Sequence, residues 1–231
     1  MLHLSVITII PEIFNSLNYG IIGQSIKKKL IKINFWNPRD YTKNSKRRID
    51  DRPYGGGPGM VIMYEPIYQA ITQAKKNMPA PYKSIYLTSH GKKITQSYLL
   101  KNIINNNQSL IFISGRYKGI DERIIIKHVN EEWSIGDFII SGGEFAAMVF
   151  IDAIVRLIPG TLNNKDSITQ DSFSNGLLDY PHYTRPMKID NLNVPSVLLS
   201  GNHLKIKKWR KEKSLKNTFS KRPDLLEHKL K

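Results

Sequence analysis

The stretch SLIFISGRYKGIDERIIIKHV, residues 109–129, decides the fold. Residues 109–114 are a short apolar run, which predicts a buried strand. A glycine-bearing turn follows the strand, and residues 121–129 then form a helical pattern with two acidic residues at its positive N-terminal end. A strand, a turn and a helix in this order form the repeating unit of a parallel α/β sheet.

The same alternation extends outward in both directions from this stretch. It predicts further strands at 3–10, 31–36, 83–89 and 137–140. Helical patterns separate these strands, at 12–19, 23–30, 65–77, 97–106 and 143–158. The predicted fold class is therefore α/β, with a mostly parallel sheet.

The amino-acid composition of the chain changes after Pro159. Residues 160–176 are polar and rich in turn formers, which is typical of a linker and longer than most connections inside a domain. Helical patterns with many basic residues follow. We predict an α/β domain at 1–160, an interdomain linker at 161–176 and a small basic helical domain at 177–231.

Composition limits the class of protein. The 231 residues include no cysteine, so disulfides and thiolate metal sites are excluded, and a reducing cytoplasm is expected. The net charge of +16 comes from 25 Lys and 10 Arg against 19 acidic residues, and an A+T-rich genome would inflate the Lys count. Residues 201–231 nevertheless carry 11 basic and 3 acidic side chains, which favours a nucleic-acid partner.

Two apolar segments raise the question of a membrane. The N-terminal stretch MLHLSVITII lacks a basic region before it, so it favours a buried strand over a signal peptide. The apolar residues 138–155 are interrupted by Glu144 and Asp152, which argues against a membrane span.

Several common chemistries have no support in the motifs. The six His residues show no metal-ligand spacing, and the segment GGGPGM lacks the Lys and Ser or Thr of a phosphate-binding P-loop. Pro11 and Glu12 stand where a Rossmann fingerprint would need glycines. Three glycine-bearing turns, which begin at Ser89, Ser114 and Ser141, instead follow predicted strands, where open α/β sheets bind ligands. Any α/β protein has some glycine at such turns.

Six motifs in a fixed order carry a family resemblance. They are RPYGGGPGM (52–60), GRYKGIDER (115–123), EWSIGDFIISGGE (132–144), DSF (171–173), PHYTRP (181–186) and LSGNH (199–203). Together they resemble the bacterial tRNA (guanine-N1)-methyltransferases, which methylate guanosine 37, beside the anticodon, with S-adenosylmethionine. The resemblance runs from the first strand to the C-terminus.

This resemblance implies a deep trefoil knot in the α/β domain and a homodimer with a composite active site. It implies that S-adenosylmethionine binds in the bend formed by three segments of the chain. The cofactor-binding residues implied are Tyr86, Leu87, Thr88, Ser89, Gly115, Ser134, Ile135, Gly136, Asp137, Phe138, Ile139, Ile140, Gly142 and Gly143.

The family also implies a catalytic pair, Asp171 and Arg156. Guanine N1 carries a proton and is a poor nucleophile, so a base must remove this proton as the methyl group arrives. Asp171 is the implied base, and Arg156 would stabilise the charge that develops on guanine O6. From the residues alone, an Asp in a turn-rich segment more often serves a turn, and Arg156 has an ion-pair spacing from Asp152.

One residue departs from the family pattern, and the basic residues near 203–210 are general candidates for contacts to tRNA. Lys118 stands where relatives read Glu in the motif GRYEG, which leaves a role for Mg²⁺ open but disfavoured. The candidate contacts to tRNA phosphates are basic residues on or before a predicted helix, namely His203, Lys205, Lys207, Lys208 and Arg210. A helix face of solvated Lys residues with no partner would show the same pattern.

Two other functions stay open at this point. One is a related knotted methyltransferase that acts on a ribose 2′-hydroxyl, which would not need the pair of Asp171 and Arg156. The other is a basic RNA-binding module or assembly factor without catalysis, whose binding to RNA would not depend on S-adenosylmethionine.

Overall fold

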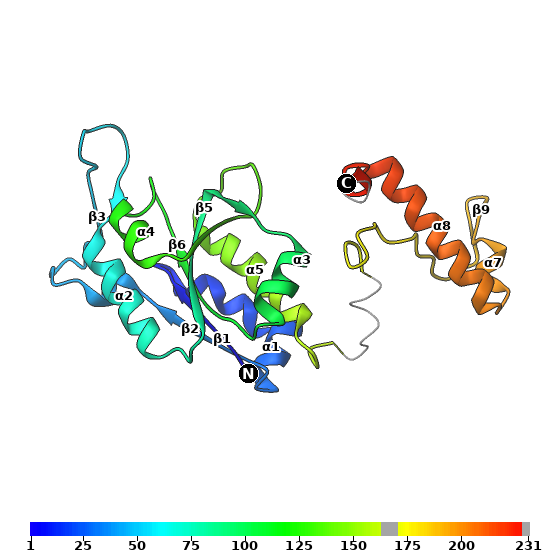
Figure 1. Cartoon of the computed structure of the whole chain (residues 1–231), viewed down its shortest axis with the longest axis horizontal. Coiled ribbons are helices and arrows are strands. Elements are labelled where there is room, and N and C mark those ends of the chain that lie inside the picture. Colours follow the sequence, from blue (N-terminus) through cyan, green and yellow to red (C-terminus); the bar gives the residue numbers. More distant parts are fainter. Residues whose placement is uncertain (163–170, 228–231) are drawn as a thin grey trace. The chain divides into compact units, whose positions relative to one another are not determined.

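The computed structural model describes residues 1–162 and 171–227 (Figure 1). The chain divides into two compact units, Met1–Asn163 and Asn164–Lys231. The first unit is an α/β structure, and the second contains mainly helices. The polar stretch predicted as a linker lies largely outside the described residues, which resume at Asp171.

A five-stranded parallel sheet forms the centre of the first unit, in the order β2-β1-β6-β5-β7. Three of its strands coincide closely with the predicted ones, and β5 extends several residues beyond its predicted end. The strands are β1 (Leu2–Ile7), β2 (Ile31–Trp36), β5 (Tyr82–Lys93), β6 (Ser109–Ser114) and β7 (Glu131–Ser134). A mostly parallel α/β fold is therefore confirmed.

Helical segments connect these strands, as the alternation predicted. They are η1 (Pro11–Asn18), α1 (Gly20–Lys27), η2 (Pro38–Tyr41), α2 (Tyr64–Lys76), α3 (Gln96–Leu99), η3 (Leu100–Ile104), α4 (Glu122–His128) and α5 (Gly143–Leu157). Asp121 caps α4, because its carboxylate accepts a hydrogen bond from the backbone N–H of Arg123 at 2.9 Å. A short antiparallel pair, β3 (Asp50–Asp51) and β4 (Val61–Ile62), frames the glycine-rich loop.

Both faces of the sheet are covered, since successive strand residues point to opposite faces. Ile7 and Ile113 pack with residues of α2 and α4 in one apolar cluster. Phe112, on the other face, stacks on Phe150 of α5 with ring centroids 6.3 Å apart. In Figure 1, α2 and α4 accordingly lie on one side of the sheet, and α1 and α5 on the other. Coverage on both faces explains why the central strands read as continuous apolar runs.

The prediction of a strand at 137–140 is wrong. These residues form a loop, and the strand lies earlier, at β7. Phe138 and Ile139 are 56% and 84% exposed, so their apolar character does not reflect burial in the sheet. Gly136 has a φ of +150°, a conformation that ends the strand before residue 137.

The described residues of the second unit, 171–227, form a hairpin and three helices. Its elements are β8 (Lys188–Ile189), β9 (Leu192–Asn193), α7 (Ser196–Leu199), α8 (His203–Lys221) and α9 (Asp224–Glu227). Thr218 of α8 is fully buried, and its hydroxyl accepts a hydrogen bond from the backbone N–H of Leu178 at 2.8 Å. The helical pattern is confirmed, whereas the hairpin was not predicted. Within the described part of the chain, we find no helix with the length and apolarity that crossing a membrane requires.

Candidate functional site

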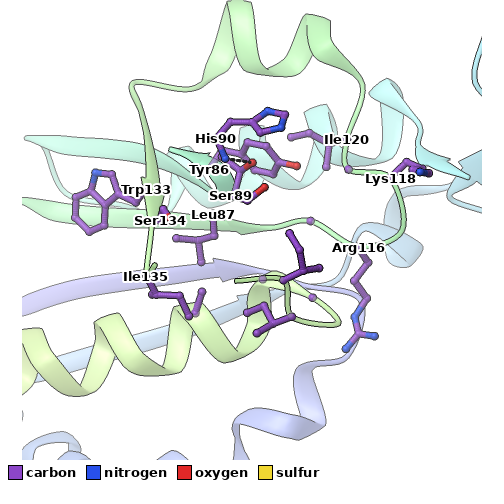
Figure 2. Close-up of a pocket in the computed structure, with 18 of the residues that line it drawn as sticks. Tyr86, Leu87, Ser89, His90, Arg116, Lys118, Ile120, Trp133, Ser134 and Ile135 are labelled. Carbon is purple, nitrogen blue, oxygen red and sulfur yellow. Dashed lines mark hydrogen bonds between the residues drawn. The ribbon is translucent and has the colours of Figure 1, made fainter. Parts of the chain in front are cut away.

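A cavity of about 290 Å³ lies at the carboxyl ends of β6 and β7, beside the bulged middle of β5 (Figure 2). Strand ends of this kind line the ligand crevice of open parallel sheets. Every residue that the resemblance implied for the cofactor lines this cavity, with the exception of Asp137. The structure therefore gathers three segments that are separated in sequence around one space.

The turn after β6 fits against its neighbours only because it contains glycine. A Cβ atom on Gly115 would lie 2.8 Å from the hydroxyl oxygen of Tyr86, which itself is almost fully buried. A Cβ on Gly143 would lie 2.9 Å from the Cα of Ser114. The backbone N–H of Gly143 donates to the carbonyl oxygen of Gly115 at 2.9 Å. The two glycine turns thus pack directly on one another and form part of the cavity wall.

A buried ion pair supports the same wall from behind. The carboxylate of Glu144, which is fully buried, accepts hydrogen bonds from Thr8 Oγ1 at 3.0 Å and Arg116 Nε at 3.1 Å. Arg116 lines the cavity. A Cβ on Gly142 would lie only 2.4 Å from Glu144 Oε2, so glycine at this position leaves room for the pair.

The loop after β7 forms the opposite side of the cavity. Ser134 Oγ accepts from the backbone N–H of Gly136 and donates to its carbonyl oxygen, both at 3.1 Å. Phe138, Ile139 and Ile140 then line the cavity. Figure 2 shows Trp133 and Ile135 on one side of the site, with Arg116 and Lys118 on the other.

Asp137 is the exception among the implied cofactor residues. Its side chain is 78% exposed and forms an ion pair with Lys93 of β5. Because neither property directs it inward, the structure does not support placing this residue among those that line the cavity.

Sequence reasoning missed part of the lining, which includes His90, Arg116, Tyr117, Gly119, Ile120, Glu122, Ile125, Trp133, Ser141 and Ala146. Most of these residues lie within the quoted motifs GRYKGIDER and EWSIGDFIISGGE, and this membership was the signal available. Glu122 supplies the one carboxylate among the described lining residues. Burial raises the pKa of the Tyr86 phenol, so this side chain stays neutral near pH 7.

Lys118 also lines the cavity, but the glycine-rich loop constrains it. Its backbone N–H donates to the carbonyl oxygen of Met60 at 2.9 Å. A Cβ on Gly59 would lie 2.8 Å from Lys118 Cγ, so the alkyl chain rests against that glycine. Figure 2 shows the Lys118 side chain extending away from Tyr86 and Leu87.

The two catalytic candidates lie in different units. Arg156 is half-buried in the last turn of α5, and Asp171 is half-buried at the start of the described part of the second unit. The carbonyl oxygen of Asp171 accepts from the backbone N–H of Ser174 at 3.3 Å, within a turn where Phe173 has a φ of +73°. Neither candidate is among the described residues that line the cavity.

The candidate tRNA contacts lie together on the first turns of α8. Asn202 caps this helix, because its side chain accepts from the backbone N–H of Lys205 at 3.0 Å. All five candidates are exposed, namely His203, Lys205, Lys207, Lys208 and Arg210. The guanidinium of Arg210 also lies 4.8 Å from the ring centroid of Tyr180, a cation–π contact that orients it. Among the described residues, no group of three or more His, Cys, Asp or Glu side chains is arranged to hold a metal ion.

Comparison with known proteins identifies similar chains over nearly the full length. The family model described as tRNA (Guanine-1)-methyltransferase TrmD matches residues 2–228. A tRNA (guanine-N(1)-)-methyltransferase of Legionella pneumophila (strain Lens) is 58% identical over 226 residues, which cover 98% of this chain and 90% of the relative. The enzyme of the same name from Buchnera aphidicola subsp. Acyrthosiphon pisum (strain APS) is 56% identical over 229 residues, or 97% and 94% of the two chains.

Proposed function

This chain belongs to the tRNA (guanine-1)-methyltransferase family, and we propose that it transfers a methyl group from S-adenosylmethionine to N1 of guanosine 37 in tRNA. The observation that carries the proposal is the cavity at the ends of β6 and β7 and beside the middle of β5, which is lined largely by two of the quoted motifs, at 115–123 and 132–144. Its volume of about 290 Å³ lies at the lower end of the range for small-molecule sites.

The residues around the cavity fit the proposed cofactor. Leu87, Ile135 and Ile140 offer apolar surface for a flat adenine, and the glycines allow the backbone to approach a ribose closely. Glu122 provides a carboxylate for the ammonium group of the methionine part. S-adenosylmethionine supplies an electrophilic methyl group on a sulfonium ion.

The catalytic pair performs the proton chemistry in this proposal. Asp171 accepts the N1 proton as the bond between N1 and the methyl carbon forms and the bond between that carbon and sulfur breaks. Arg156 donates hydrogen bonds to guanine O6, where negative charge develops, and this makes the N1 proton easier to remove. The electron pair of the broken bond stays on sulfur, so the products are 1-methylguanosine and a neutral thioether.

Three further features belong to the same proposal. The α/β unit contains a deep trefoil knot, the enzyme is a homodimer with a composite active site, and the reaction takes place in the cytoplasm with tRNA as its substrate. The resemblance to the family supports all three. A homodimer would let Asp171 of one protomer serve a cavity of its partner, and the basic residues of α8 would contact tRNA phosphates.

The decisive experiment measures methyl transfer to a tRNA transcript with guanosine 37 and to one with adenosine 37. We expect transfer only to the first, with 1-methylguanosine as the product in mass spectrometry of the digested tRNA. A 2′-O-methylated nucleoside would favour the ribose-directed alternative, and RNA binding without transfer would favour a non-catalytic module.

A pair of variants tests the proposed base. Asp171→Asn removes the proton acceptor, so transfer should fall by at least about 100-fold while S-adenosylmethionine still binds. Asp190→Asn, in the turn between β8 and β9, is the matched control and should retain full activity. Near-normal turnover of Asp171→Asn would overturn the assignment.

A further inference from the structure

A carboxylate outside the cavity has three hydrogen-bond donors from three different elements. Glu131, the first residue of β7, accepts from Lys83 of β5 through Oε1 at 2.5 Å. Its other oxygen, Oε2, accepts from the hydroxyl of Tyr98 on α3 at 2.5 Å and from Trp133 Nε1 at 2.8 Å. The side chain is only 25% exposed. The family motifs and the proposed chemistry leave Glu131 without an assigned role.

Strand geometry explains how Glu131 reaches the indole of Trp133. Residues two apart on a strand point to the same face, so both side chains of β7 lie on the face that packs against α5. The indole ring contacts Phe150 at a centroid distance of 5.2 Å and Phe112 at 6.0 Å, both edge to face. Trp133 is 1% exposed, and its polar N–H is satisfied by Glu131.

Trp133 is also the point where two of the segments that line the cavity meet. It lines the cavity and directly precedes the loop of Ser134 to Ile140. Its backbone pairs with both Leu87 and Lys92 of β5, around a bulge that contains the implied cofactor residues Thr88 and Ser89. A displacement of Trp133 would therefore move both segments.

The electrostatics of the cluster favour an ionised carboxylate at neutral pH. Burial opposes the charge on Glu131, but hydrogen bonds from Lys83, Tyr98 and Trp133 lower its pKa below the ordinary value. Burial, together with the hydrogen bond to Glu131, raises the pKa of Tyr98 to about 12. Tyr98 therefore remains a donor across the working range of the enzyme.

We propose that Glu131 is a positioning residue for methyl transfer, which acts by holding Trp133 and thereby the two cofactor segments that meet at it. The inference rests on the proposed function, because the cavity must bind S-adenosylmethionine. Glu131 touches neither the cofactor nor guanine in this account. Its effect is on cofactor affinity, transmitted through one indole N–H.

The test compares three single variants and one double variant with the wild-type enzyme. Glu131→Gln keeps the size of the side chain but removes its charge, and its single neutral amide oxygen cannot serve all three donors, because the amide nitrogen only donates. Trp133→Phe keeps an aromatic ring against Phe150 but lacks the N–H. Lys83→Met is the matched control, because it removes one partner of Glu131 and leaves the bond to Trp133 intact.

We measure the Kd of S-adenosylmethionine by calorimetry, KM and kcat for methyl transfer, and the melting temperature. Glu131→Gln and Trp133→Phe should each raise Kd and KM about tenfold, with kcat at saturating cofactor changed less than about twofold. Lys83→Met should stay within about twofold of the wild type in Kd. The double variant of Glu131→Gln and Trp133→Phe should bind no more weakly than the weaker single variant, because both substitutions act on the same hydrogen bond.

Three results would overturn the proposal. An unchanged cofactor Kd in Glu131→Gln, with only a lower melting temperature, would reduce Glu131 to a structural role. Multiplied effects in the double variant would show that Glu131 does not act through Trp133. An equal loss in Lys83→Met would assign the effect to the ion pair. A wild-type enzyme that binds S-adenosylmethionine but transfers no methyl group would instead refute the proposed function and leave the Kd comparison intact.

Should Glu131→Gln fail to fold, Tyr98→Phe provides the milder perturbation. It removes one donor from Oε2 and leaves the bond to Trp133 in place. A rise in Kd of about two- to threefold is expected, because Tyr98 shares Oε2 with Trp133 and fixes that oxygen, whereas Lys83 holds the other oxygen. A Kd equal to that of the wild type would count against the proposal.

Discussion

Replacement of Glu144 by Ala tests the ion pair behind the cavity wall. Glu144 is fully buried and accepts hydrogen bonds from Thr8 and Arg116, whose side chain is 20% exposed. Breaking a fully buried pair costs about 3–5 kcal/mol, because the remaining charge stays buried without a partner. Since Arg116 keeps some contact with water, the lower end applies, and we expect a loss of about 3 kcal/mol in the free energy of unfolding.

Urea unfolding followed by circular dichroism measures this loss. A destabilisation of about 3 kcal/mol in a unit of this size should also lower the melting temperature by about 6–12 °C. Asp152→Ala is the matched control, because Asp152 is an exposed acidic residue on the same helix and should change stability by less than about 0.5 kcal/mol. Adding Arg116→Ala to Glu144→Ala should recover part of the loss, since the unpaired charge is then removed.

The reasoning fails if Glu144→Ala unfolds within about 0.5 kcal/mol of the wild type. It also fails if the double variant loses the full sum of the two single losses, because that result would mean that the two side chains contribute independently.

Three further predictions concern other parts of the molecule. Gly142→Ala places a Cβ 2.4 Å from Glu144 Oε2, so stability should fall by about 1–3 kcal/mol and cofactor affinity should fall with it; wild-type values in urea unfolding and calorimetry would contradict this. Tyr98 has a folded-state pKa of about 12, so the unfolded chain ionises first and stability is lost as the pH rises from about 10 to 12. Urea midpoints of Tyr98→Phe should fall less over that range, and equal slopes would refute the reasoning. Lys207→Gln, on the exposed face of α8, should reduce the salt slope of tRNA binding by about 1, whereas an unchanged slope would exclude a phosphate contact.

The sheet was predictable where burial on both faces produces continuous apolar runs. Residues 109–114 read as a strand for this reason, whereas 31–36 read as one from alternating apolar and polar residues at the sheet edge, and both are strands in the structure. The edge strand β7 was missed because its sequence EEWS contains two acidic residues, one of which is held by Lys83 and Tyr98, 48 and 33 residues away in sequence. No local pattern contains that information.

The apolar residues 138–140 led to the opposite error. Hydrophobic side chains in a strand-length run indicate burial in a sheet, but these line a cavity at its edge and remain largely exposed. A ligand site and a core strand both select apolar residues, so composition cannot separate them. Glycine at 136, 142 and 143 was the available sign that the segment is a loop, since glycine weakens a strand.

The effect of the charged residues around the cavity on a bound ligand depends on how these residues are paired in the folded structure. Arg116 and Lys118 would both oppose a sulfonium ion if sequence proximity alone decided their effect. Glu144, 28 residues from Arg116, neutralises that guanidinium, and Lys118 lies against Gly59 and extends away from Tyr86 and Leu87. Glu122 is then the one carboxylate in the described lining that can pair with a positive charge of the proposed cofactor, even though the chain carries a net charge of +16. Lys118 is therefore compatible with binding of the proposed cofactor S-adenosylmethionine. The position of the Lys118 side chain, and not its charge alone, determines how strongly it repels the sulfonium ion.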